Sequence, residues 1–201
     1  MPPLPLGFYD VPRPPGLEID HIQRAITFIE SGLTEWIEVY FQQMNLFSAL
    51  VSVFGAKALD SVSSYEKNPH RHKAAGAFPD LCRRGCSTSD PRNCLESKGS
   101  KRPWPIQAHY NHSGWYIVWR YLVDETETIQ PGRPIIIWRV DSVFLEKTDW
   151  KYEGSKAGSE GGGRTHTFSV KDAAKRLRGC ALYQRQGIVL RHSKPVPVSV
   201  P

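Results

Sequence analysis

The sequence predicts an α/β (α+β) protein with a mixed central sheet flanked by helices, the first of which precede the sheet. Two observations lead to this prediction. Apolar residues recur at helical spacing over 18–44 and again over 47–65. Later, the runs 115–123 and 134–145 are rich in Ile, Val, Trp and Tyr, as buried strands are. Helices that come before a series of strands bury their apolar faces by packing on the resulting sheet.

The length and composition indicate a single domain without a membrane span. A chain of 201 residues with a hydrophobic content of 40% is long and apolar enough for one core. No run of about 18 apolar residues is present, and the start lacks the basic and apolar stretches of a signal peptide. We therefore expect a cytoplasmic protein. Its parts are a Pro-rich arm, a helical region, a sheet core and a tail, over 1–15, 16–67, 70–192 and 193–201.

The helical region is expected to hold two helices. The first has apolar residues every three or four positions from Ile22 to Leu33, with Gly32 as a candidate interruption. The second ends at Asn68, because the residue before a proline disfavours the helical conformation. An irregular connector over 82–93, rich in Arg, Gly, Ser and Asp, then separates the helices from most of the strands.

The second half of the chain is expected to be mostly strand. A Gly-rich segment over 154–163 interrupts it and should be flexible. A short basic helix over 171–178 would have Ser169 as its N-cap and Gly179 as its C-terminal stop. The tail over 195–201 is expected to be extended. The predicted strands are 94–98, 115–123, 134–145, 165–170 and 181–190.

The most informative residues lie in the middle of the chain. Asp80 follows Phe78-Pro79, and the triplet Glu96-Ser97-Lys98 comes after a further fifteen residues. Side chains at positions i and i+2 of a strand leave the same face. Glu96 and Lys98 should therefore point together, with Ser97 behind them, and an aspartate on a neighbouring strand can meet Glu96.

That arrangement predicts a metal site with hydrolytic chemistry. Two adjacent carboxylates, Asp80 and Glu96, are costly to keep ionised without a cation. Mg²⁺ binds oxygen ligands and retains several waters, so it would resolve the conflict. Lys98 beside the ion would lower the pKa of a water or stabilise a pentavalent phosphate. The sequence therefore predicts metal-assisted hydrolysis of a phosphodiester.

The same residues resemble the PD-(D/E)xK nuclease superfamily, whose members have the restriction-endonuclease-like fold. Pro79-Asp80 corresponds to the PD element and Glu96-Ser97-Lys98 to the ExK element; the resemblance covers about 78–98 and the strands after it. It implies an α-β-β-β-α-β core and an Mg²⁺-dependent DNA endonuclease, with Mn²⁺ as a substitute metal. Asp80 and Glu96 would hold the metal, and Lys98 would complete the catalytic set. A type II restriction enzyme acting as a homodimer on double-stranded DNA is one form of this expectation.

The charge of the chain favours a polyanionic partner. The formal net charge is +6, and the basic residues are clustered. The basic segment Gly99-Ser100-Lys101-Arg102 follows the triplet, and a basic glycine-rich loop occurs later in the chain. Gln107 and His109 follow this basic segment. They would contact the scissile phosphate or a base, or they would simply belong to a polar loop. The candidate DNA contacts are Lys101, Arg102, Gln107, His109, Lys156 and Arg164.

Three cysteines between the two motif elements support an alternative function. Cys82, Cys86 and Cys94 have the spacing C-x3-C-x7-C, which lacks a paired C-x2-C knuckle. With a fourth ligand from His70, His72 or Cys180 they would hold Zn²⁺ in a non-catalytic nucleic-acid-binding protein. Three reduced thiols in a polar loop are the simpler interpretation, and a protein-interaction domain with incidental basic charge is a third function.

Overall fold

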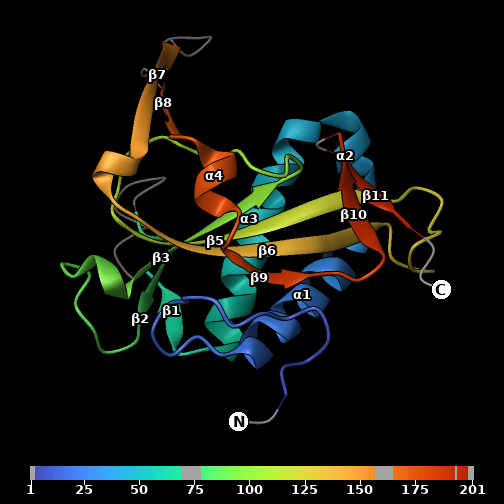
Figure 1. Cartoon of the computed structure of the whole chain (residues 1–201), viewed down its shortest axis with the longest axis horizontal. Coiled ribbons are helices and arrows are strands. Elements are labelled where there is room, and N and C mark those ends of the chain that lie inside the picture. The colour runs from blue at the N-terminus through green and yellow to red at the C-terminus, as the bar shows by residue number, and fades with distance from the viewer. Residues whose placement is uncertain (1–2, 69–77, 157–164, 193, 199–201) are drawn as a thin grey trace.

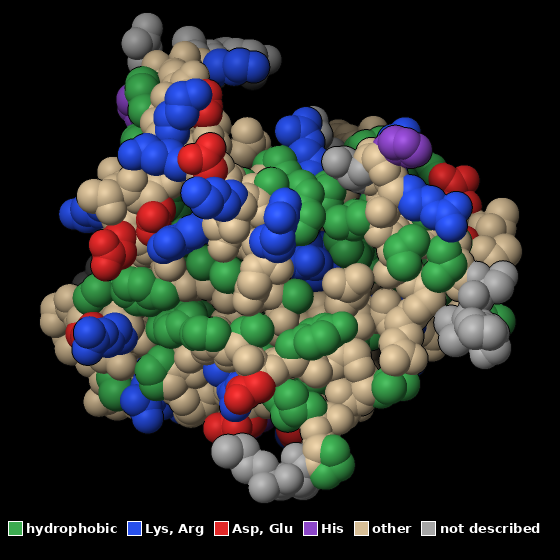
Figure 2. Space-filling view, viewed as in Figure 1, with side chains coloured by type: hydrophobic (Ala, Val, Ile, Leu, Met, Phe, Trp, Pro, Cys, Tyr) green, Lys and Arg blue, Asp and Glu red, His purple; other side chains and the backbone are tan. Residues whose placement is uncertain are grey.

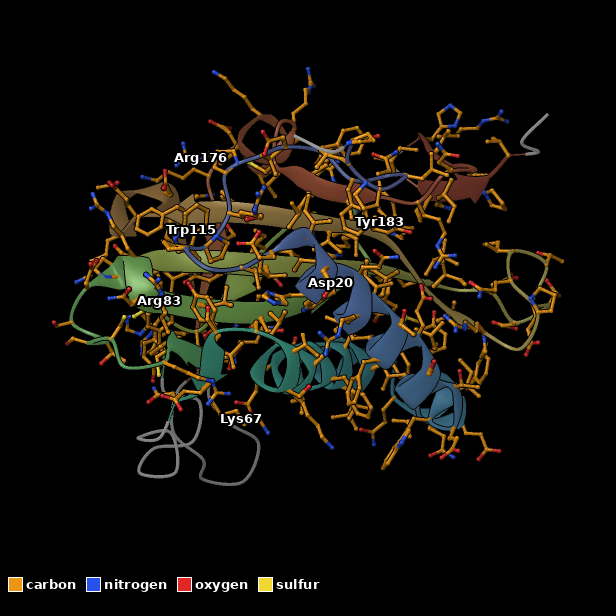
Figure 3. The ribbon with its side chains drawn as sticks, turned by 90° about the horizontal axis from the view of Figure 1, so that it is seen from below. Asp20, Lys67, Arg83, Trp115, Arg176 and Tyr183 are labelled. Carbon is orange, nitrogen blue, oxygen red and sulfur yellow. The ribbon has the colours of Figure 1, made fainter. Side chains whose placement is uncertain are left out.

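A six-stranded mixed sheet forms the centre of the molecule (Figure 1). The computed structural model describes residues 3–68, 78–156, 165–192 and 194–198. The strand order is β1-β2-β3-β5-β6-β9, in which β3 and β5 are parallel and all other neighbours are antiparallel. In Figure 3, Tyr183 marks the β9 edge and Lys67 marks the β1 edge. The strands are β1 (Tyr65–Lys67), β2 (Leu81–Arg83), β3 (Cys94–Ser100), β5 (Gly114–Val123), β6 (Ile135–Leu145) and β9 (Ala181–Gln184).

Helices cover one face of the sheet and smaller elements cover the other (Figure 1). The helical face has α1 (Ile19–Thr34), α2 (Ile37–Gln42) and α3 (Met44–Val62). The opposite face has α4 (Ala173–Leu177) and a three-stranded sheet of β4 (Gln107–Ala108), β8 (Thr165–Val170) and β7 (Trp150–Lys156). The remaining elements are the strand pair β10 (Ile188–Arg191) and β11 (Lys194–Pro197), and the 3-10 turns Pro91–Asn93 and Lys147–Asp149.

The long strands are apolar because both of their faces are buried. On β5, the side chains of Ile117, Trp119 and Tyr121 pack on the helical side. Tyr116 and Val118, which alternate with them, pack against the elements of the other side. Strands covered on both faces appear in a sequence as continuous apolar runs. The predicted α/β architecture, in which N-terminal helices pack on a mixed sheet, is confirmed.

The helical region differs from expectation at Gly32. This residue lies inside α1, and the chain leaves the helix two residues later, at Thr34. A Cβ on Gly32 would come within 2.6 Å of the Phe54 ring on α3. Gly32 is therefore a point of close helix packing. The helical run predicted over 18–44 is interrupted, but two residues after Gly32, where α1 ends at Thr34 and α2 begins at Ile37.

Several other boundaries also differ. The N-cap of α4 is Asp172, so the expectation for Ser169 was wrong. The last predicted strand is divided into β9 and β10 around Gly187, whose φ of +74° favours glycine. Gly154 to Lys156 belong to β7, and the rest of the predicted Gly-rich segment lies outside the described residues. Residues 101–113, all described, contain β4 and no helix, whereas the α-β-β-β-α-β order places a helix after the third strand.

None of the described helices is both long enough and apolar enough to cross a membrane.

Candidate active site

The structure brings Asp80, Glu96 and Lys98 together at the β2–β3 pair. The antiparallel register pairs Leu81 with Leu95, which places Asp80, just before β2, beside Glu96. The Asp80 backbone N–H donates to Glu96 Oε2 at 3.0 Å, and the Lys98 ammonium lies 2.8 Å from Glu96 Oε1. Glu96 and Lys98 therefore leave the same face of β3, as their i and i+2 spacing predicts.

Ser97, the middle residue of the triplet, anchors β3 to helix α3. Ser97 Oγ donates to the Ser52 carbonyl of α3 at 2.8 Å and accepts from Trp119 Nε1 at 3.0 Å. The Ser97 backbone N–H donates to Asp80 Oδ2 at 2.9 Å. Ser97 thus binds α3 on one side and orients the Asp80 carboxylate through its backbone. Because its side chain is held on the helical face, Glu96 and Lys98 must point to the opposite face.

Gly99 allows β3 to approach α3 at this point. A Cβ on Gly99 would lie 2.4 Å from the Ser48 carbonyl oxygen and 2.7 Å from Val51 Cβ, so a larger residue would clash. The Gly99 backbone N–H also donates to Ser52 Oγ at 2.7 Å. Close contact with the helix therefore extends along β3 beyond the triplet.

Two cavities meet at Lys98. The first, of about 500 Å³, is lined by Asp80, Glu96 and Lys98, together with aromatic side chains and residues of α3. The second, of about 410 Å³, is lined by Lys98, Lys101 and Arg102, with the start of α3 on its other side. The first cavity therefore holds both carboxylates together with Lys67 and Lys98, the second is lined by cations without an acid, and Lys98 lines both.

The three polar side chains are shielded from solvent. Asp80 is 6% exposed, and the Glu96 and Lys98 side chains are 14% and 25% exposed. Their charges act on Tyr116, whose pKa is raised first by burial and then by Glu96 and Asp80. Its phenol therefore stays protonated, and it donates to the His112 carbonyl at 3.1 Å.

The donor set suits a magnesium ion. Mg²⁺ is commonly bound by one or two carboxylates, with waters and substrate phosphates completing its shell. Asp80 and Glu96 supply two carboxylates on residues joined by the hydrogen bond from the Asp80 backbone to Glu96 Oε2, and a carboxylate has several lone pairs beyond those used here. Among the described residues, no group of three or more His, Cys, Asp and Glu side chains is placed to hold a metal. Waters and phosphate oxygens would therefore have to fill the other positions.

The predicted DNA contacts are divided between the cavities and the hairpin. Lys101, Arg102 and Gln107 line the second cavity, and His109 lines the first. Lys101 also donates to the Tyr40 hydroxyl and lies 4.8 Å from the centre of that ring. Lys156 is exposed at the end of β7, on the hairpin that projects from the body in Figure 1. Arg164 lies outside the described residues.

A buried arginine, which the sequence analysis missed, shapes the basic segment. Arg120 on β5 is fully buried and donates to the carbonyls of Arg102, Trp104 and Pro105 at 2.8–3.1 Å. Its Nε lies 2.8 Å from Asp141 Oδ2 on β6. Arg120 therefore holds the chain that follows β3 against the sheet. An arginine between Trp119 and Tyr121 in an otherwise apolar run was the available signal.

The cysteines do not form a metal centre of their own. Cys82 and Cys94 face each other across β2 and β3, and burial raises the pKa of both thiols, to about 11 for Cys94. Cys94 donates to the Thr88 carbonyl at 3.3 Å. Cys180 directly precedes β9, at the opposite edge of the sheet. Since no three-ligand group exists among the described residues, the zinc interpretation has no support there; His70 and His72 lie outside them.

Comparisons of the chain with protein-family models, with curated proteins and with solved structures found no match. Functional inference for this protein therefore depends on the chemistry of its own residues.

Proposed function

We propose that this protein is a metal-dependent DNA endonuclease that hydrolyses phosphodiester bonds. One observation carries the proposal. Asp80 and Glu96, from adjacent strands, contact each other in a cavity where Lys98 lies 2.8 Å from Glu96. The β2–β3 pair that bears them and the parallel β3–β5 pair are consistent with a restriction-endonuclease-like core. The missing helix after β3 is a departure from that core.

In the proposed reaction each residue has a distinct part. Asp80 and Glu96 would hold Mg²⁺, or Mn²⁺ in its place, and the bound ion would polarise the phosphate and lower the pKa of a coordinated water. Lys98 keeps a positive charge beside the carboxylates, where negative charge develops on the phosphate in the transition state. Lys101 and Arg102, in the adjoining cavity, would bind the phosphates next to the scissile one.

The charge distribution supports DNA as the substrate. The net charge is +6, and exposed Lys and Arg side chains also gather over α4 and the β7–β8 hairpin in the upper part of Figure 2. These side chains include Lys151, Lys171, Lys175 and Arg178. Cations on several elements would contact the backbone of double-stranded DNA beyond the cleavage point. A type II restriction activity is included in this proposal.

The proposal extends to a homodimer. Large apolar side chains are exposed just before α2, on α2 and in the first turn of α3, among them Trp36, Phe41 and Leu46. Exposed apolar side chains gathered on neighbouring elements favour a surface covered by a partner. Light scattering coupled to size-exclusion chromatography would give the mass, and a monomer at micromolar concentration would refute this part alone.

Plasmid cleavage tests the main proposal. Supercoiled plasmid is incubated with the protein and Mg²⁺, with EDTA as one control. Asp80→Asn and Glu96→Gln should abolish cleavage while leaving much of the DNA affinity, because the carboxylates hold the metal and other side chains bind the backbone. Asp20→Asn is the matched control, since Asp20 is an exposed acid on α1 (Figure 3). Cleavage that persists in EDTA or in both site variants would refute the assignment. Retarded plasmid that stays intact, together with intact single-stranded DNA treated in parallel, would indicate a non-catalytic binder.

A further inference from the structure

Aromatic rings border the cavity that holds the candidate catalytic residues. Phe78, Tyr110 and His112 all line it together with Asp80 and Glu96. The rings of Phe78 and His112 are stacked, with centroids 4.5 Å apart and planes inclined by 21°. Tyr110 continues the group, with its centroid 5.4 Å from that of His112. The carboxylates therefore share their cavity with a connected series of flat apolar surfaces.

The inner end of this series of rings is held in place by β5. Phe78 lies over Tyr116, with centroids 6.4 Å apart, and Tyr116 is bonded to the His112 backbone. A Cβ on Gly114 would come within 2.8 Å of the Phe78 ring, so glycine at that position makes room for the ring. Phe78 also directly precedes Pro79-Asp80. The same short segment thus positions both an aromatic ring and a catalytic carboxylate.

The outer end of the series is open. Tyr110 is 54% exposed, which leaves much of its ring uncovered, although a ring of that size gains by burial. His112 is half-buried, and burial, followed by the charge of Lys147, lowers its pKa, so the imidazole is neutral at pH 7. A neutral imidazole beside an exposed phenol can stack on another flat ring without adding a charge to the site.

Cations lie on the other side of the carboxylates. Lys98 belongs to both cavities, and Lys101 and Arg102 line the second. Aromatic rings and the two candidate metal-binding carboxylates therefore share one cavity with Lys67 and Lys98, and a group of cations lines the adjoining cavity. A nucleotide offers the complementary series: a base with a π face, the scissile phosphate, and the next phosphate along the strand.

We propose that this cavity binds the base of the nucleotide next to the scissile phosphate on the rings of Tyr110 and His112, and that the substrate is DNA with unpaired nucleotides at the cleavage point. The inference rests on the proposed nuclease function and narrows its substrate class: DNA unpaired at the cleavage point would replace the continuous duplex that a type II restriction enzyme cleaves. A base inside a continuous duplex is stacked and paired, so reaching these rings would require that it be flipped out. Single strands, gaps and frayed ends offer the base without that cost.

Binding to matched DNAs tests the preference. With Ca²⁺ replacing Mg²⁺ to prevent cleavage, fluorescence anisotropy measures the affinity of wild-type protein for one labelled strand presented alone, in a full duplex, and in a duplex with a short gap. The single-stranded and gapped forms should bind more tightly than the duplex. Equal affinities, or a preference for the full duplex, would overturn the proposal.

Variants of Tyr110 test the role of the ring. Tyr110→Ala should weaken binding to the gapped DNA about tenfold, as loss of one stacked base does, with little effect on the duplex. Tyr110→Phe should retain the wild-type affinity because it keeps the ring. Tyr9→Ala is the matched control, since Tyr9 is 50% exposed and its backbone N–H bonds to Leu182 at the β9 edge of the sheet. A Tyr110→Ala protein that behaves like Tyr9→Ala would refute the stacking role.

Photo-crosslinking separates this proposal from the nuclease proposal. A gapped DNA with 5-iododeoxyuridine in its unpaired stretch is irradiated on the protein, and the linked peptide is identified by mass spectrometry. A link to Tyr110 or His112 supports the base site even if the wild type cleaves no DNA, a result that would refute only the nuclease function. Cleavage of DNA without a link to either ring would overturn the base site and leave the nuclease function standing.

Discussion

Removal of the Asp141 carboxylate should destabilise this protein more than the loss of any surface charge. Asp141 is fully buried on β6 and joins two guanidinium groups, with Arg120 Nε 2.8 Å from one oxygen and Arg139 Nε 2.6 Å from the other. Burial lowers the pKa of Arg120, and the charge and hydrogen bond of Asp141 act against that shift. Asp141→Asn would leave two buried cations without a counter-charge. Breaking a buried ion pair in this way costs about 3–5 kcal/mol.

Urea unfolding followed by tryptophan fluorescence measures this effect, because Trp119 and Trp138 are buried. The Asp20→Asn variant is again the control: Asp20 is 69% exposed and lies 3.5 Å from Arg24, a surface pair worth about 0–1 kcal/mol. Since small domains have only about 5–15 kcal/mol of stability, the Asp141→Asn midpoint should fall far below that of the control.

A second variant guards against an unfolded single mutant. Adding Arg139→Met to Asp141→Asn removes one of the two uncompensated cations and should restore part of the lost stability. The two changes act on one network, so their effects should not add. An Asp141→Asn protein within about 1 kcal/mol of the Asp20→Asn control would refute the electrostatic reasoning.

Three further predictions concern the site and its surroundings. Gly99→Ala should lower the free energy of unfolding by about 1–3 kcal/mol, because the new methyl group would meet the Ser48 carbonyl at 2.4 Å; an unchanged free energy of unfolding would contradict this. Burial lowers the pKa of His112 in the folded state from 6.5, so the unfolded chain binds more protons and stability should fall as the pH drops below 6.5 towards the folded pKa. Urea titrations from pH 7.5 to pH 5 should show that fall, and His112→Gln should remove its share of it; an equal fall in both proteins would exclude His112 as its source. Replacing Lys101 and Arg102 with Ala should reduce the slope of log affinity against log salt by up to about 2, and an unchanged slope would show that they do not contact phosphates.

The sequence predicted an element correctly where the periodicity of its apolar residues matched the surface that the fold buries. The strands β5 and β6 are apolar on both faces because helices cover one side and smaller elements the other. The Glu96-Ser97-Lys98 triplet could be interpreted for a similar reason, since alternation on a strand fixes which side chains share a face. Its meeting with Asp80 required one further assumption, that the two segments pair, and their register in the structure provides that pairing.

The remaining features depend on tertiary contacts that a local pattern does not contain. The strand β7 has exposed polar residues along much of its length and exists because it pairs with β8. Cys82 and Cys94 suggested a metal site by their spacing, but pairing of β2 with β3 buries both thiols. The stacking of Phe78 on His112 was also missed, because the two residues are far apart in the sequence and meet only in the folded chain.

The connection between β3 and β5 links the buried charges to the proposed activity. Parallel strands need a crossover, which is usually a helix that satisfies its own backbone. Pro103 and Pro105 oppose a helix in this crossover, so its carbonyls need other donors. Arg120 provides them from the sheet, and Asp141 balances its charge. The crossover is thereby held against the sheet, and Lys101 and Arg102 at its start border the same cavity as Lys98. Arg120 thus satisfies the backbone carbonyls that a helix would otherwise satisfy internally. It thereby keeps Lys101 and Arg102 near the carboxylates.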